Sequence, residues 1–254
     1  MLVLISNDDG IHAPGIKALV DEVKKIADVV VVAPDTQQSA VGHAITVNFP
    51  LRVYKVQFNG EFFGYAVNGT PADAVKLAVR SLLTQKPDLV ISGINHGSNT
   101  AISVIYSGTV SAATEGTILG IPSFAISLTT FRDADFSYAA KFASRLALLI
   151  SKQGLPKGTL LNVNVPPVPE NEIRGVVVTK QGKSVWNDEF ESRRDPNNRE
   201  YFWLKGDLLE LDHSDDIDQR AVSNNMVSIT PLHYDLTDYE MFETMKHWDI
   251  KSLK

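Results

Sequence analysis

The hydrophobic and polar positions along the chain alternate apolar runs of strand length with segments of helical periodicity. The expected strands are 2–5, 28–34, 87–93, 121–127 and 158–166, and the expected helices are 14–27, 70–83, 107–120 and 136–153. Continuous Val, Ile and Leu runs joined by helices are typical of a parallel sheet covered on both faces. The pattern therefore predicts an α/β fold, a Rossmann-like, doubly wound three-layer sandwich with a mostly parallel sheet.

Two segments depart from this alternation. Residues 44–68 have the period of short strands, and Asn59-Gly60 is a hairpin turn signal. After residue 167, strands are expected at 173–182 and 200–211, on either side of a polar loop at 187–199, with a terminal helix near 237–246. We therefore expect a Rossmann-like catalytic core over 1–167 and a β-rich C-terminal extension with a terminal helix over 168–254.

Composition and charge narrow the class of protein. The 254 residues are 44% hydrophobic and 21% charged, with a net charge of −6 and no clustered Lys or Arg, which argues against binding to a nucleic-acid polymer. No apolar run is long enough to span a membrane, and the first residues do not resemble a signal peptide. The absence of cysteine excludes thiolate chemistry and fits a cytoplasmic protein, which is the expectation.

The glycine-containing segment GIHAPGIK after the first strand superficially resembles a phosphate-binding loop. A P-loop places Lys directly after its last Gly and follows it with Ser or Thr, whereas here Lys17 comes one residue late and precedes Ala18. Gly10 and Gly15 also do not form the dinucleotide-binding pattern. The segment is better interpreted as a turn in which Pro14 begins a helix.

The adjacent carboxylates of Asp8 and Asp9 follow the first strand directly. Neighbouring residues on a strand point to opposite faces, so the two carboxylates can share a target only where the strand has ended. Two carboxylates about 4 Å apart repel by roughly 4 kcal/mol at a partly screened site, and a divalent cation would reverse the sign of that interaction. The simpler explanation is a solvated pair in which one Asp caps a helix.

Three further polar clusters follow later strands or begin a helix. They are residues 35–43 with Ser39, residues 93–99 with Asn95, and residues 106–110 with Ser107, Gly108 and Thr109. Taken singly, these clusters are explained by a loop, a tight turn and a helix N-cap. All of them are expected near one edge of a doubly wound sheet, and their oxygen donors suit Mg²⁺ or Mn²⁺.

Two other features favour structural explanations. In the segment GTPAD, Thr70 is expected to cap a helix, Pro71 to occupy its first position and Asp73 to complete a capping box. The six histidines are scattered and form no H-x-x-x-H pair, so a zinc site is not expected.

Several motifs occur in one order along the chain: NDDG followed by PG, a Ser after VVAPD, GTPAD, PDLVISGINHGSN, YSGTVSAATEG, IPSFAIS, LNVNVP and VSITPL. This ordered set resembles the SurE family of divalent-metal-dependent nucleotidases. The resemblance covers most of the chain and is densest over residues 1–127. Ala40, Ala74 and the pair Asn225-Met226 differ from residues frequent in the family, but none of them is a candidate ligand.

The resemblance implies hydrolysis of nucleoside 5′- and 3′-monophosphates, with short-chain polyphosphate as a further substrate. It also implies one bound Mg²⁺ or Mn²⁺ and a homodimer or dimer of dimers assembled through the C-terminal extension. By position, Asp8, Asp9, Ser39 and Asn95 resemble the family's metal ligands, and residues 107–109 match the phosphate-binding segment. Asp8 and Asp9 are the candidate catalytic residues, with Asp9 assisting deprotonation of a water.

Two alternatives to this hydrolase remain open. An aspartyl-nucleophile phosphatase would use Asp8 or Asp9 to form a phosphoenzyme, although NDDGI lacks the D-x-D pattern of that class. A non-catalytic nucleotide-binding or regulatory module would keep the ligand set without turnover.

Overall fold

A large, mostly parallel β-sheet forms the centre of the protein. The structure, a computed structural model, describes residues 1–132 and 134–254, and in these residues the sheet has nine strands in the order β3-β4-β2-β1-β5-β6-β7-β11-β8. Its parallel part consists of β4 (Glu61–Val67), β2 (Asp28–Pro34), β1 (Leu2–Ser6), β5 (Leu89–His96), β6 (Ser123–Leu128) and β7 (Thr159–Val165). The predicted Rossmann-like α/β fold is confirmed.

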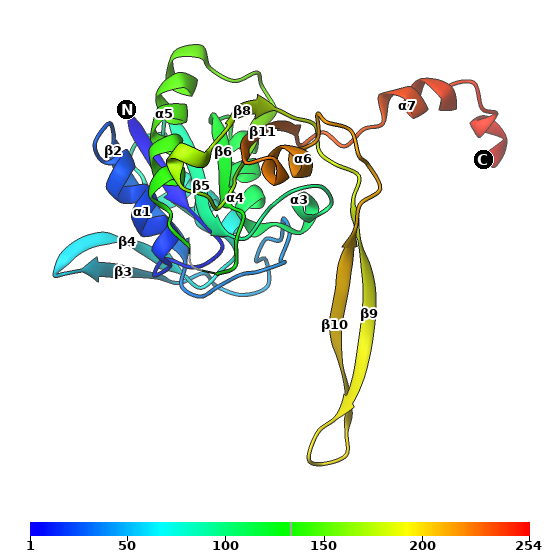
Figure 1. Cartoon of the computed structure of the whole chain (residues 1–254), viewed down its shortest axis with the longest axis horizontal. Coiled ribbons are helices and arrows are strands. Elements are labelled where there is room, and N and C mark those ends of the chain that lie inside the picture. Colours follow the sequence, from blue (N-terminus) through cyan, green and yellow to red (C-terminus); the bar gives the residue numbers. More distant parts are fainter. Residues whose placement is uncertain (133) are drawn as a thin grey trace.

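Helices cover both faces of this sheet (Figure 1). On one face α1 (Pro14–Val23) packs beside α5 (Ser137–Gln153), and Leu19 and Ala143 are buried in the same apolar cluster. On the other face α2 (Pro71–Leu77) packs beside α4 (Gly108–Ile118), with Val75 and Ala112 in a second cluster. This double coverage explains why the central strands are almost wholly apolar.

The strand order reverses direction at β1. β2 pairs with one edge of β1, whereas β5 pairs with the other, and all three strands are parallel. The loops after β1 and β5 therefore leave the sheet side by side and diverge toward opposite faces. Such a switch point opens a crevice beyond the carboxyl ends of the strands, where ligands bind in open α/β sheets.

The predicted hairpin at Asn59-Gly60 joins β3 (Val53–Phe58) to β4 at the edge of the sheet. Both turn residues have positive φ values, 51° and 84°, as the turn type requires. The expectation of strands from residue 44 onward is wrong, because β3 starts only at Val53. Before it, Thr46 is held by Asp73 instead, to which its N–H and Oγ1 donate at 2.9 and 2.6 Å.

The helix expected over 70–83 divides into two parts. The predicted capping box is present at its start, where Thr70 and Asp73 exchange side-chain to backbone hydrogen bonds. The α-helix ends at Leu77 and continues as a π-helical turn over Ala78–Leu82. The wider turn leaves Leu82 packed against the apolar cluster of this face.

The chain after residue 167 returns to the large sheet before it leaves again. β11 (Met226–His233) pairs antiparallel with β7, and β8 (Gly175–Val178) pairs with β11, so the sheet crosses the expected boundary at 167. The remaining short helices are α3 (Ser103–Tyr106), α6 (Asp218–Ser223), α7 (Tyr239–Met245) and the 3₁₀ turns Glu170–Glu172 and Ile250–Leu253. The predicted terminal helix corresponds to α7.

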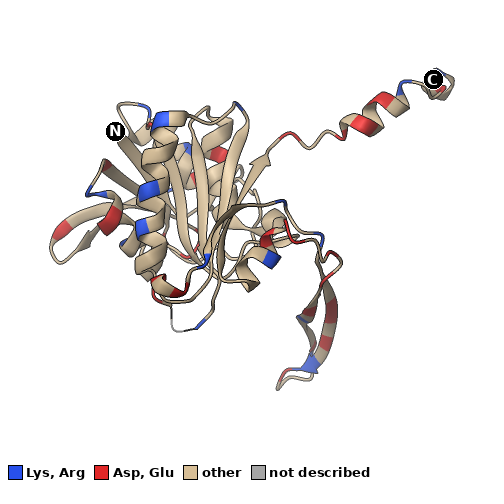
Figure 2. Cartoon of the chain, turned by 45° about the horizontal axis from the view of Figure 1, so that its top comes forward, with Lys and Arg blue, Asp and Glu red and all other residues tan. Residues whose placement is uncertain are grey.

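The polar loop expected over 187–199 is wrong for residues 187–194 and holds only for the turn at residues 195–199, whereas the strand expected over 200–211 is confirmed as β10 (Glu200–Leu209). Residues Val185–Arg194 form strand β9, which pairs antiparallel with β10 in a hairpin that projects from the body (Figure 1). Basic and acidic residues are interspersed along this hairpin (Figure 2). The hairpin packs against no layer of helices, so its strands need no continuous apolar face. The charged residues of β9 therefore gave no strand pattern in the sequence.

Among residues 1–132 and 134–254, no helix is both long enough and apolar enough to cross a membrane.

Candidate active site

A cavity of about 730 Å³ lies at the switch point, beyond the carboxyl ends of β1 and β5. Its lining includes five of the residues expected at the site: Asp8, Asp9, Ser39, Asn95 and Ser107. Gly108 and Thr109 contact Asp8 from behind. The structure therefore brings all the candidate residues together, although they come from four separate segments of the chain.

Asp8 is positioned by the turn that ends β1. Its backbone carbonyl accepts from the Gln38 N–H at 2.7 Å, which ties this turn to the segment after β2. Its Oδ1 accepts from the Thr109 hydroxyl at 2.5 Å. Gly108 permits this approach, since a Cβ there would lie 2.7 Å from the Asp8 Cβ. The Asp8 side chain is consequently buried against the start of α4.

Asp9 connects the first strand to the fifth. Its Oδ2 accepts from the His96 N–H at 3.0 Å, and its Oδ1 accepts from the Gln37 side-chain amide at 3.3 Å. These contacts turn Asp9 into the same cavity as Asp8. The break after Ser6 thus lets two adjacent carboxylates face one target.

Both carboxyl groups have raised pKa values. Burial raises the pKa of Asp8 to about 6, the hydrogen bond from Thr109 opposes this shift, and the charge of Asp9 adds to it. Burial likewise raises the pKa of Asp9, although the hydrogen bond from the His96 N–H opposes this shift. The protein alone stabilises two charges here poorly, and a cation between them would favour both ionised forms.

Asn95 lies within β5, so the tight turn expected at residues 93–99 starts later than predicted. β5 continues to His96 after a register shift, and Asn95 pairs with Ser127 of β6. The Asn95 side-chain N–H donates to the Gly97 carbonyl at 2.7 Å. That bond fixes the amide, leaving its oxygen on the opposite side of the group.

Ser39 reaches the cavity from the loop after β2 and is exposed. This loop is anchored behind the site by His43, whose ring lies 3.0 Å from the buried carboxylate of Glu115 on α4. Lys76 of α2 contacts the same carboxylate at 2.8 Å. Burial raises the pKa of Glu115, but the bonds and charges of His43 and Lys76 outweigh it and lower this pKa overall. Sequence reasoning missed this cluster because its members are far apart along the chain.

The start of α4 forms another wall beside Asp8. The Ser107 hydroxyl accepts from the Val110 N–H at 3.1 Å, which confirms that this residue is an N-cap. Within the described part of the chain, the Gly108 N–H has no backbone or side-chain acceptor. A helix N-terminus with a free N–H group attracts anions through its dipole and its donor.

The donor set of this site is oxygen-rich. The four candidate ligands, Asp8, Asp9, Ser39 and Asn95, supply two carboxylates, one hydroxyl and one amide to the cavity. Across residues 1–132 and 134–254 there is no group of three or more His, Cys, Asp or Glu side chains able to hold a metal. The set fits a hard cation such as Mg²⁺ or Mn²⁺ better than zinc.

One wall of the cavity was not anticipated. The root of the β9–β10 hairpin contributes what we call the hairpin wall: Trp186, Asp188, Leu204, Lys205 and Gly206. The sequence did not place this wall, because residues 187–199, which include Asp188, read as a polar loop, and the strand expected over 200–211 gave no indication that it borders the cavity.

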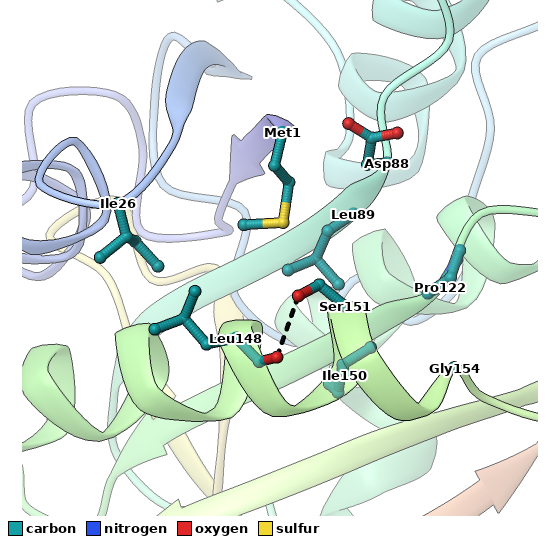
Figure 3. A pocket seen from close by; sticks show the side chains of 9 residues that line it. All are labelled: Met1, Ile26, Asp88, Leu89, Pro122, Leu148, Ile150, Ser151 and Gly154. Carbon is teal, nitrogen blue, oxygen red and sulfur yellow. Dashed lines mark hydrogen bonds between the residues drawn. The ribbon is translucent and has the colours of Figure 1, made fainter.

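A second cavity, of about 400 Å³, lies at the opposite end of the strands (Figure 3). It is lined mainly by apolar side chains from the starts of β1 and β5 and from α5, including Met1, Leu89 and Leu148. Its carboxylate, Asp88, accepts from the Leu2 N–H at 2.7 Å and therefore has a structural partner. This cavity lacks the convergent polar groups of the first.

Comparison with known proteins identifies the family of the chain. Residues 3–188 match the family model described as Survival protein SurE. The chain belongs to the SurE family. Two relatives named 5′-nucleotidase SurE, from Chlorobium chlorochromatii and Syntrophobacter fumaroxidans, are each 49% identical to it; the aligned parts cover 98% of this chain and 92% and 100% of those proteins.

The fold of this SurE chain also matches a solved structure. The crystal structure of the SurE protein from Aquifex aeolicus superposes with a TM-score of 0.85 at 41% identity, over 97% of this chain and 99% of that one. The resemblance noted from the ordered motifs is therefore confirmed, and it extends beyond the residues that carried it.

Proposed function

We propose that the chain is a divalent-metal-dependent 5′-nucleotidase that releases phosphate from nucleoside monophosphates. The observation that carries this proposal is the convergence of Asp8, Asp9, Ser39 and Asn95 on one cavity, beside the N-terminus of α4. The names of the relatives, 5′-nucleotidase SurE, supply the reaction class.

In this mechanism Asp8, Asp9, Ser39 and Asn95 would hold the metal, and residues 107–109 would receive the phosphate. When bound, Mg²⁺ or Mn²⁺ would supply Lewis-acid activation of a phosphoryl oxygen and of a water. The free Gly108 N–H and the α4 dipole stabilise negative charge that develops on the phosphoryl oxygens. Asp9, with its raised pKa, accepts the proton of the attacking water.

The same geometry supports a wider set of phosphate substrates. The candidate metal ligands and residues 107–109 would contact only the terminal phosphate group, which 5′-monophosphates, 3′-monophosphates and short polyphosphates share. We therefore include 3′-monophosphates and short-chain polyphosphate as secondary substrates in the proposal.

Phosphate release from a panel of nucleoside 5′- and 3′-monophosphates and polyphosphate, with EDTA, Mg²⁺ or Mn²⁺, tests this function. We expect release with either metal and its loss in EDTA, with recovery when the metal is restored. Nucleotide binding without release under any metal would favour the non-catalytic module instead. Trapping a phosphoaspartate at Asp8 or Asp9 would favour the aspartyl-nucleophile phosphatase.

We further propose that residues 1–167 supply the catalytic core, completed by β8, α6 and β11, and that a C-terminal arm (residues 234–254) mediates assembly into a homodimer or dimer of dimers. The arm extends away from the sheet (Figure 1) and exposes large apolar side chains. These include Leu236, 92% exposed, and Phe242, 51% exposed. Apolar surface of this kind on a detached arm is typical of a segment that packs on another subunit.

The chain with the double substitution Leu236→Asp/Phe242→Asp should sediment as a smaller species than the unaltered chain. Burying two carboxylates between subunits costs free energy, so the arm should no longer pack on another subunit. Sedimentation velocity measures this, with the exposed Glu240→Gln in α7 as the matched control. An unchanged sedimentation coefficient in the double variant would refute assembly through the arm.

A further inference from the structure

The hairpin wall gives the cavity a second, chemically different side. The candidate metal ligands and residues 107–109 belong to the core. The hairpin wall differs, because Trp186 and Asp188 come from β9 and Leu204 and Gly206 come from β10. A site that needed only to hold phosphate would not require this wall. Its composition therefore bears on what is attached to the phosphate.

The register of the hairpin places its side chains on defined faces. Trp186 is opposite Leu208, Asp188 is opposite Gly206, and Phe190 is opposite Leu204. Residues opposite one another in an antiparallel pair share a face, as do residues two apart along a strand. Trp186, Asp188, Gly206 and Leu204 thus share the face that lines the cavity.

Gly206 leaves this face open beside Trp186. It has no side chain, and a Cβ at this position would lie 2.5 Å from the Asn187 carbonyl oxygen. Trp186 is 45% exposed, so a flat ligand can approach it. Lys205, which also borders the cavity, lies on the other face with its ammonium 3.8 Å from Glu189.

The other exposed aromatic side chains of the cavity belong to the core. Phe131 packs over Gly97 and lies near the ring of His96, next to Asn95. Tyr106 immediately precedes the N-cap Ser107. Trp186 is the aromatic residue of the hairpin wall and comes from a different segment of the chain.

We propose that the hairpin wall is the base-binding subsite: Trp186 stacks on the nucleobase, and Asp188 accepts a hydrogen bond from an amino or ring N–H of the base. This inference rests on the proposed function, in which the core binds the phosphate of the same nucleotide. An aromatic platform with one carboxylate suits a flat ring that carries donors on its edge. Phosphate esters without a base make no use of the wall.

The test compares nucleoside 5′-monophosphates with ribose 5-phosphate, which lacks the base, in Trp186→Ala. Stacking on an aromatic side chain contributes enough that kcat/KM for the nucleotides should fall about 10- to 100-fold. The value for ribose 5-phosphate should stay within about twofold, and Trp186→Phe should restore most of the nucleotide activity. Trp203→Ala is the matched control, since this tryptophan lies on the opposite face of the hairpin, is 58% exposed and does not line the cavity.

Binding separates this inference from the proposed function. Calorimetric titration with Mg²⁺ present should show Trp186→Ala weakening nucleoside monophosphates selectively over ribose 5-phosphate, even if no phosphate is released by the unaltered chain. Asp188→Asn should change the order of affinities among the four bases. Equal loss for both ligands in Trp186→Ala, or no loss for either, would overturn the base-binding subsite while leaving the nucleotidase proposal intact.

Discussion

Replacing Asp8 with Asn is expected to reduce phosphate release by about 10²–10³-fold, the loss typical when one preorganised partner of transition-state charge is removed. The amide has nearly the same shape and still accepts from the Thr109 hydroxyl, so the fold is retained while one negative charge at the metal is lost. Steady-state kinetics over a range of Mn²⁺ concentrations measures the effect. Burial raises the pKa of Asp8 to about 6. The Mn²⁺ concentration that the unaltered chain needs for half-maximal turnover should therefore rise as the pH falls below that value, because protons compete with the metal for the carboxylate.

Two further substitutions serve as the control and as a second test of this prediction. Asp21→Asn removes the same charge from an exposed position on α1, where the carboxylate pairs with Lys17, and should leave turnover unchanged. Asp9→Asn should resemble Asp8→Asn, because it faces the same cavity. Full metal-dependent turnover in Asp9→Asn would refute the two-carboxylate site.

Gly15→Ala is expected to destabilise the protein by about 3 kcal/mol, although the substitution would stabilise an isolated helix. Gly15 is buried in the first turn of α1, where the helix crosses β5. A Cβ there would lie 2.1 Å from the Ile94 carbonyl oxygen and 3.2 Å from the ring of Phe136. Backbone atoms cannot move aside cheaply, so the helix must shift away from the sheet. Equilibrium unfolding in urea measures the change.

Lys17→Ala is the matched control in the same helix. Lys17 is exposed and forms an (i, i+4) ion pair with Asp21, so its loss should change the free energy of unfolding by no more than about 0.5 kcal/mol. A rise in stability for Gly15→Ala would show that helix propensity outweighs the contact with Ile94.

The loop after β1 illustrates how much of the site was predictable. Polar side chains that follow buried strands mark the edge where a doubly wound sheet binds ligands, and this placed Asp8, Asp9 and Ser39 near one another. The sequence also identified Pro14 as the first residue of a helix. It placed Gly15 in this helix without a reason for glycine there, because the carbonyl of Ile94 that excludes a side chain is about eighty positions away.

The β9–β10 hairpin illustrates the opposite case. Period-2 alternation is a sheet signal only where one face is buried, and this hairpin is exposed on both. Its backbone pairing needs no apolar pattern, so the charged run from Asn187 to Arg194 carried no usable signal. The hairpin wall, and with it the base-binding proposal, came from the tertiary structure.

The sequence by itself determined the alternation of the main strands and helices in residues 1–167, the capping of α2 and α4, and the residue types available for an oxygen-donor site. These properties depend on local periodicity and on hydrogen bonds between near neighbours. Only the tertiary structure decided that Thr109 and Gly108 enclose Asp8, that Glu115 anchors the loop of Ser39, and that Trp186 faces the cavity. Each of these contacts joins segments brought together by packing of the whole sheet, and side chains so far apart in sequence leave no local pattern to read.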